Sequence, residues 1–257
     1  MAARRLEGKR CLVTGGSRGL GLAIGLAFAR AGGRVAFTYS RNTEDAADAR
    51  AQLRAAAASA GTPEALGEPL DFRGAVSDAA HVSETVGALT KAWGGVDVLV
   101  NCAGPTQILP IALLEEADWD SVMNGNVKGA YLFSRAVLKS MIRARAGHIL
   151  NIGTFASERV VEAPVHYAAA KAALRGMTEA LAKEVGRYNI KVNLVAPGLL
   201  DAGLSRTLPR HRLDEYVSQC PIGRLGSVTE LADAVTFLVS DENTFMTGAK
   251  LGFDGGV

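Results

Sequence analysis

Short apolar runs alternate with longer segments of helical character along almost the whole chain. The runs are hydrophobic at successive positions instead of at every second one, which is typical of strands covered on both faces, as in a parallel sheet. We predict strands over residues 10–14, 34–39, 66–72, 96–101, 148–153, 191–196 and 250–253.

The segments between these runs are rich in good helix formers, above all alanine. We predict helices over residues 20–31, 43–60, 79–93, 117–145, 167–187 and 228–240. This alternation predicts an α/β Rossmann fold, doubly wound, with about seven parallel strands and helices on both faces. No domain-boundary linker interrupts it, so we expect residues 1–257 to form a single domain.

Residues 199–225 stand outside this alternation. They contain Pro209, Pro221 and several glycine, arginine and leucine residues. We therefore expect a substrate flap of short helices here and not a core element.

Composition and charge limit the classes of function. The chain of 257 residues is 48% hydrophobic with a formal net charge of +2, so nothing electrostatic demands nucleic acid or an anionic membrane, and we expect neither as a partner. No apolar run is long enough to span a bilayer, and the short basic N-terminus does not indicate a secretory signal. Cys11, Cys102 and Cys220 form no metal-ligand pattern, so we expect free thiols, no metal and a cytoplasmic location.

A glycine-rich turn, with the sequence TGGSRGLG, follows the first predicted strand at residues 14–21. Glycines let the backbone turn tightly and approach a pyrophosphate. The helix that begins near Leu20 would point its N–H groups and its positive dipole end at that phosphate. The spacing of Gly15, Gly19 and Gly21 differs from G-x-G-x-x-G but uses the same mechanics, so it predicts a dinucleotide site. A tight turn without a ligand is the alternative.

A second signal is the pair Tyr167 and Lys171, which lie four residues apart and face the same side of a predicted helix. A free phenol titrates near ~10, and a cation one turn away favours the phenolate. We therefore expect Lys171 to lower the pKa of Tyr167, so that the pair exchanges a proton with a carbonyl or alcohol oxygen. The spacing alone is common on helices where the lysine simply reaches solvent.

In order and at matching spacing, these motifs resemble the short-chain dehydrogenase/reductase family. The resemblance covers residues 6–257 and includes Asn101-Cys102-Ala103-Gly104, in place of the family's Asn-Asn-Ala-Gly, and Pro197-Gly198 after the sixth strand. It implies hydride transfer between a nicotinamide cofactor and a substrate carbon.

The resemblance also implies residue roles. Tyr167 would donate a proton to the substrate oxygen, Lys171 would bond the nicotinamide ribose, and Asn126 would hold a water in a proton relay. The residues implied to contact the cofactor are Gly15, Ser17, Arg18, Gly19, Leu20, Gly21, Ser40, Arg41, Val76, Asn101, Ala103, Gly104, Tyr167, Lys171, Pro197 and Gly198.

Thr154 stands where the family usually has its catalytic serine. A threonine keeps a hydroxyl that can donate to a carbonyl oxygen, while its methyl group stiffens the side chain. Ser157 is an alternative donor. Two smaller departures are Ala75, where an acid or amide usually meets the adenine, and Ala202, where a threonine often bonds the carboxamide.

The end of the second strand bears on the choice of cofactor. An NAD site usually has a carboxylate there, whereas this chain has Ser40 and Arg41, and its nearest acids, Glu44 and Asp45, lie in the next helix. Arg41 and Arg18 can pair with a 2′-phosphate, and the resemblance supports this role, so we expect NADPH. The alternative is that both arginines are solvated surface residues.

Within the family the chain is most similar to 3-oxoacyl-acyl-carrier-protein reductases, which implies reduction of a 3-oxoacyl thioester on a carrier protein or coenzyme A. A carrier protein is acidic, and Arg143, Arg145 and Arg187 fall at or near places where such reductases carry carrier-binding arginines; ordinary solvated helix ends are equally compatible with them. A homotetramer is also implied, through residues 117–145 and 167–187.

Two other functions stay open. One is a ketoreductase of a free, aromatic or polyketide ketone in a specialised pathway. The other is a non-catalytic partner subunit of a hetero-oligomeric reductase, for which the departures at Thr154, Ala75 and Ala202 speak.

Overall fold

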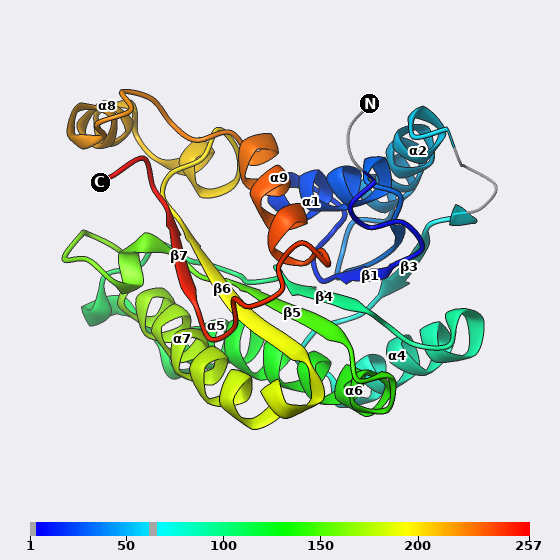
Figure 1. The fold of residues 1–257 in the computed structure, drawn as a ribbon. Coiled ribbons are helices and arrows are strands. Elements are labelled where there is room, and N and C mark those ends of the chain that lie inside the picture. The colour runs from blue at the N-terminus through cyan, green and yellow to red at the C-terminus, as the bar shows by residue number, and fades with distance from the viewer. Residues whose placement is uncertain (1–3, 62–65) are drawn as a thin grey trace.

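The computed structural model describes residues 4–61 and 66–257. Seven strands form one sheet in the order β3-β2-β1-β4-β5-β6-β7, and every neighbouring pair runs parallel (Figure 1). The predicted seven-stranded parallel sheet is confirmed. The strands are β1 (Arg10–Val13), β2 (Arg34–Tyr39), β3 (Leu70–Arg73), β4 (Val98–Asn101), β5 (Gly147–Ile152), β6 (Ile190–Pro197) and β7 (Lys250–Phe253).

Helices cover both faces of the sheet, so the doubly wound arrangement is also confirmed (Figure 1). One face carries α1 (Gly19–Arg30), α2 (Thr43–Ser59) and α9 (Val228–Leu238). The other carries α4 (Ala79–Trp93), α5 (Glu116–Met123), α6 (Gly129–Ala144) and α7 (Val165–Val185). Phe28 and Phe37 fill the first core layer, and Phe133 and Val137 fill the second.

The direction in which the chain builds the sheet reverses between β1 and β4. From β1 the chain proceeds outward to β2 and β3, then returns to place β4 on the other side of β1. In open α/β sheets ligands bind at such a switch point, outside the carboxyl ends of the strands. The glycine-rich turn after β1 lies at this edge.

The predicted helix over residues 117–145 contains an interruption. The predicted range is formed by α5 and α6, which are joined by a five-residue π-helix, η2 (Asn124–Lys128). The π-helix interrupts the regular backbone hydrogen bonds of the helix, and the Asn126 side chain compensates for part of this loss. Its Nδ2 donates to the carbonyls of Val122 and Pro105, both at 2.9 Å. Asn126 is thus held in the interior of the protein, where it is 1% exposed.

The segment 199–225 contains short helices, as predicted: the 3-10 helix η5 (Gly203–Thr207) and α8 (Arg210–Gln219). In Figure 1, α8 stands apart from both helical layers, on the side where β7 ends. In the described part of the chain, no helix has the length and apolar character needed to cross a membrane.

Candidate active site

The turn between β1 and α1 requires glycine at several positions. Gly15 and Gly19 have φ angles of 69° and 56°, in the left-handed region that favours glycine. A Cβ at Gly21 would lie 2.3 Å from the Gly15 carbonyl oxygen, and one at Gly15 would lie 3.0 Å from Cα of Ala103. The backbone of this turn is therefore tightly packed. The first N–H groups of α1 have no carbonyl partner within their own helix, so they can bind an anion.

Thr14 joins this turn to the segment after β4. Its Oγ1 accepts hydrogen bonds from the backbone N–H groups of Cys102 and Ala103, both at 3.0 Å. The two loops that flank the switch point are thus joined, and Gly15 packs against Ala103. Ser17 and Leu20 belong to the same turn and are partly buried.

The opposite end of the predicted dinucleotide site has no acidic group at the strand end. Ser40 and Arg41 are exposed directly after β2, and Arg18 is exposed at the N-cap of α1. Glu44 and Asp45 lie in the first turn of α2, where the Asn42 side chain accepts hydrogen bonds from their backbone N–H groups. Within the described ranges, neither arginine pairs with an acidic side chain.

Tyr167, Lys171 and Thr154 meet at the carboxyl end of β5. Tyr167 and Lys171 occupy the first turns of α7, and the Lys171 Nζ lies 5.6 Å from the centroid of the Tyr167 ring. Lys171 is 4% exposed, and its Nζ donates to the Ile152 carbonyl at 2.8 Å. Thr154 follows β5 and places its hydroxyl within hydrogen-bonding reach of the Tyr167 phenol.

The pKa values correct the expectation for Tyr167. Burial raises the pKa of Tyr167 to about 12, and the hydrogen bond with Thr154 only partly opposes this. Burial also lowers the pKa of Lys171 to about 8. Both shifts have the same main cause, since burial disfavours the charged form of either group. Tyr167 is therefore a protonated donor at neutral pH.

Asn126 and Lys171 face the same small region beside Gly104. A Cβ at Gly104 would lie 2.2 Å from the Asn126 Oδ1 and 3.1 Å from the Lys171 Nζ. The Asn126 Oδ1 is buried and accepts no hydrogen bond from the described residues. A buried acceptor that faces an ammonium group suits the end of a proton path.

Asn101, which is predicted to contact the cofactor, has its side chain buried among neighbouring side chains. Its side chain is 4% exposed, and Nδ2 donates to Asn151 Oδ1 at 2.8 Å and to Ser134 Oγ at 3.2 Å. Asn151 in turn donates to Thr178. The Asn101 side chain thus ties β4 to β5 from inside the fold. Val76 lies partly buried against Gly129, and Pro197 is buried at the end of β6.

Sequence reasoning missed two aromatic residues beside this site. Phe155 directly follows Thr154, and Tyr216 projects from α8; their rings meet edge to face at 5.6 Å. The Tyr216 hydroxyl also lies so close to Gly198 that a Cβ there would be 1.9 Å away. Tyr216 is the one buried residue of α8, and the spacing of Leu213, Tyr216 and Val217 places them on one side of α8 only once this segment is known to be a helix.

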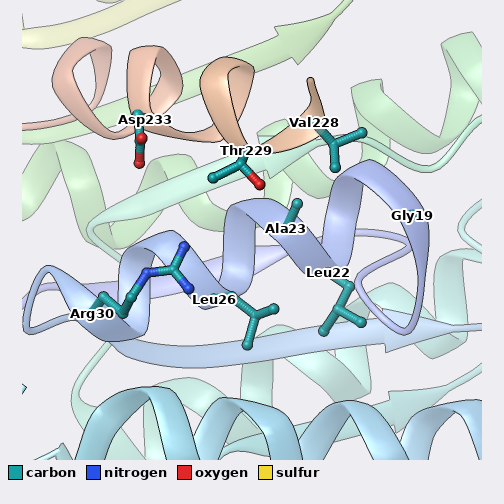
Figure 2. A pocket seen from close by; sticks show the side chains of 8 residues that line it. All are labelled: Gly19, Leu22, Ala23, Leu26, Arg30, Val228, Thr229 and Asp233. Carbon is teal, nitrogen blue, oxygen red and sulfur yellow. The ribbon is translucent and has the colours of Figure 1, made fainter. Parts of the chain in front are cut away.

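A groove of about 470 Å³ lies between α1 and α9 and has Gly19 of the glycine-rich turn in its lining (Figure 2). Leu22, Leu26 and Arg30 line it from α1, and Val228, Thr229 and Asp233 line it from α9. Its lining includes no predicted catalytic residue from the described part of the chain, so this groove is not where the chemistry lies.

Comparison with known proteins agrees with this geometry. A family model described as "Enoyl-(Acyl carrier protein) reductase" matches residues 15–257. The chain belongs to the short-chain dehydrogenase/reductase family. Among its relatives are proteins named 3-oxoacyl-[acyl-carrier-protein] reductase FabG from Pseudomonas aeruginosa, 38% identical, and from Thermotoga maritima, 36% identical. The alignment covers 98% of this chain in both cases, and 98% and 99% of the respective relatives.

A solved structure is similar over almost the same extent. It is titled a putative short-chain alcohol dehydrogenase from Sinorhizobium meliloti 1021, with a TM-score of 0.87 and 32% identity, covering 98% of this chain and 96% of the other. As a short-chain dehydrogenase/reductase, the chain is an oxidoreductase of a family that uses a nicotinamide cofactor. The glycine-rich turn fits such a group, since a Cβ at Gly19 would meet nothing within 4 Å, while the absence of a Cβ at Gly21 lets the turn stay tight.

Proposed function

We propose that this protein is an NADPH-dependent ketoreductase that reduces a 3-oxoacyl thioester, on acyl carrier protein or coenzyme A, to a secondary alcohol in the cytoplasm. The observation that carries the proposal is the Tyr167 phenol, protonated at neutral pH, beside the Thr154 hydroxyl and the Lys171 ammonium group. The names of the relatives support the choice of substrate.

In this mechanism the chain's residues position the ketone and supply a proton. Bound NADPH supplies a hydride to the carbonyl carbon. The Thr154 hydroxyl donates a hydrogen bond to the carbonyl oxygen, and Tyr167 Oη gives its proton to that oxygen. The Lys171 cation stabilises the phenolate that remains. Lys171 also bonds the nicotinamide ribose, and a water held by Asn126 returns the proton from solvent.

The preference for NADPH over NADH rests on Arg18 and Arg41. Both are exposed at the place that a 2′-phosphate would take, and neither is neutralised by an acid within the described ranges. A charge-assisted hydrogen bond contributes about 1.5–3 kcal/mol, so loss of Arg41 should weaken NADPH binding by about 10-fold or more. The KM for NADH should change little in Arg41→Ala; a lower KM for NADH than for NADPH in the wild type would contradict the assignment.

The substrate is tested by one assay series with both cofactors. Acetoacetyl-CoA and acetoacetyl-carrier protein test thioester ketones, ethyl acetoacetate and an aromatic ketone test free ketones, and crotonyl-CoA tests the enoyl reduction named by the family model. We expect NADPH oxidation with the two acetoacetyl thioesters and none with crotonyl-CoA. Faster turnover of free ketones would favour the specialised-pathway alternative. NADPH binding without any turnover would favour a non-catalytic subunit.

Carrier docking at Arg143, Arg145 and Arg187 belongs to this proposal, and so does a homotetramer. The three arginines are exposed where α6 and α7 end, at the edge of the sheet where β5 and β6 begin. Tyr167 lies at the other edge. A carrier held by these arginines would therefore serve the site of a neighbouring subunit. Arg145→Glu should raise the KM for acetoacetyl-carrier protein and leave that for acetoacetyl-CoA unchanged, and light scattering should give four times the chain mass.

A further inference from the structure

The flap helix α8 is anchored to the body of the protein by Tyr216, beside which Leu213 and Val217 are partly buried. The Tyr216 side chain is 7% exposed, while the other residues of α8 are partly or fully exposed. Within α8, Tyr216 therefore makes the deepest contact with the rest of the protein.

Tyr216 reaches the ends of three neighbouring strands. Its ring meets that of Phe155, which follows β5, at an interplanar angle of 80°. Its Oη lies over Gly198, which follows β6, and donates to the carbonyl of Asp254, which follows β7, at 2.9 Å. The position of α8 and the backbone directly after Thr154 are therefore joined through a single side chain.

A second contact holds the same segment to α8. Arg212 lies one turn before Tyr216, so both project from the same side of the helix. Arg212 pairs with Glu162, and Arg159 from the same segment pairs with Asp254 at 3.4 Å. The segment between Thr154 and α7 is thus held at three places by α8 and by the chain after β7.

We propose that Tyr216 is a positioning residue for the reduction. When α8 is seated, Tyr216 fixes the backbone at Phe155 so that the Thr154 hydroxyl stays beside the Tyr167 phenol. Closing the flap over a ketone and aligning the hydroxyl that binds its oxygen are then one event. This inference rests on the role proposed above for Thr154 and adds a residue that does not itself touch the reacting atoms.

The kinetic test compares Tyr216→Leu in two backgrounds. Removing the aromatic ring should lower kcat by about 10-fold in the otherwise wild-type protein, with an unchanged Kd for NADPH. In Thr154→Ala the same substitution should lower kcat by less than about 2-fold, because the group it positions is already gone. An equal loss in both backgrounds, or an effect confined to KM, would overturn the proposal.

Two milder variants guard against a folding defect. Tyr216→Phe keeps the ring contact and loses only the bond to Asp254, so its kcat should fall less than that of Tyr216→Leu. Tyr188→Phe removes the same atom at the opposite edge of the sheet and should leave kcat unchanged.

Hydrogen exchange tests the coupling without turnover. Tyr216→Leu should speed amide exchange at residues 155–158 as well as in α8, whereas Ser218→Ala, an exposed change on α8, should affect neither segment. Faster exchange in α8 alone would overturn the coupling. If the wild type reduced no ketone, the proposed function would fail while this measurement would still decide whether Tyr216 joins the two segments.

Discussion

The cofactor side and the substrate side of this site are built from different parts of the polypeptide. On the cofactor side the shape comes from main-chain contacts, such as that between Gly15 and Gly21. On the substrate side it comes from side chains, with Thr154 beside Tyr167 and Tyr216 against Phe155. A backbone site permits little change and fits one kind of ligand, whereas a side-chain site varies by substitution. The use of the cofactor can therefore be inferred from a sequence motif, whereas the identity of the ketone substrate cannot.

The largest effect should separate the two sides most cleanly. Tyr167→Phe removes the proton donor and keeps the ring, so kcat should fall by about 10³-fold while the Kd for NADPH changes less than about 3-fold. Stopped-flow assays and fluorescence titration measure the two quantities. A variant that retained most of its kcat would show that the proton comes from another group.

A change on the cofactor side should do the reverse. Gly21→Ala forces a Cβ to within 2.3 Å of the Gly15 carbonyl oxygen, so the turn must open. We expect NADPH to bind about 100-fold more weakly, which corresponds to about 2.7 kcal/mol. Gly176→Ala is the matched control, because a Cβ there meets nothing within 4 Å in the middle of α7. It should bind NADPH normally and be more stable by about 0.5–1 kcal/mol.

The same division explains what the sequence could predict. The strands alternate with helices and the glycine turn has a fixed spacing, so the fold and the cofactor edge follow from local pattern. The interruption of the helix over residues 117–145 does not follow from local pattern, because the Asn126 side chain there also donates to the carbonyl of Pro105, 21 positions away in the sequence. The contact of Tyr216 with Phe155 joins residues 61 positions apart in the sequence, and no spacing rule reports it.

Thr154 lies between these two extremes. Its place in the site can be predicted from the motif, but the direction of its hydroxyl cannot. Thr154→Ala should lower kcat by about 10-fold or more, because a hydroxyl that supports the transition state is lost. Thr154→Ser should keep most of the activity. Ser157→Ala is the matched control, because the Ser157 Oγ already donates to the Thr154 carbonyl at 2.8 Å. A larger loss in the Ser157 variant would transfer the role to that residue.

The smallest effect tests the electrostatics that sequence reasoning got wrong. Spacing predicts that Lys171 lowers the pKa of Tyr167, but burial acts on both groups and raises the pKa of Tyr167 to about 12. The pKa of Lys171 falls to about 8, so Lys171 is the group that titrates in the working range and is charged only below that pH. As the pH rises from about 7 to about 8.5, the charged fraction of Lys171 drops about fourfold, and kcat for ketone reduction should drop with it.

This decline reports the loss of the Lys171 charge that stabilises the phenolate of Tyr167. The decline of kcat with pH should be absent from the residual activity of Lys171→Met. In Arg41→Ala, which changes NADPH binding, the pH midpoint of the decline should be the same as in the wild type. A kcat that stays constant up to about pH 10 would mean that Lys171 keeps its charge in the loaded enzyme, so that the bound cofactor, and not the fold alone, sets the proton affinity of the pair.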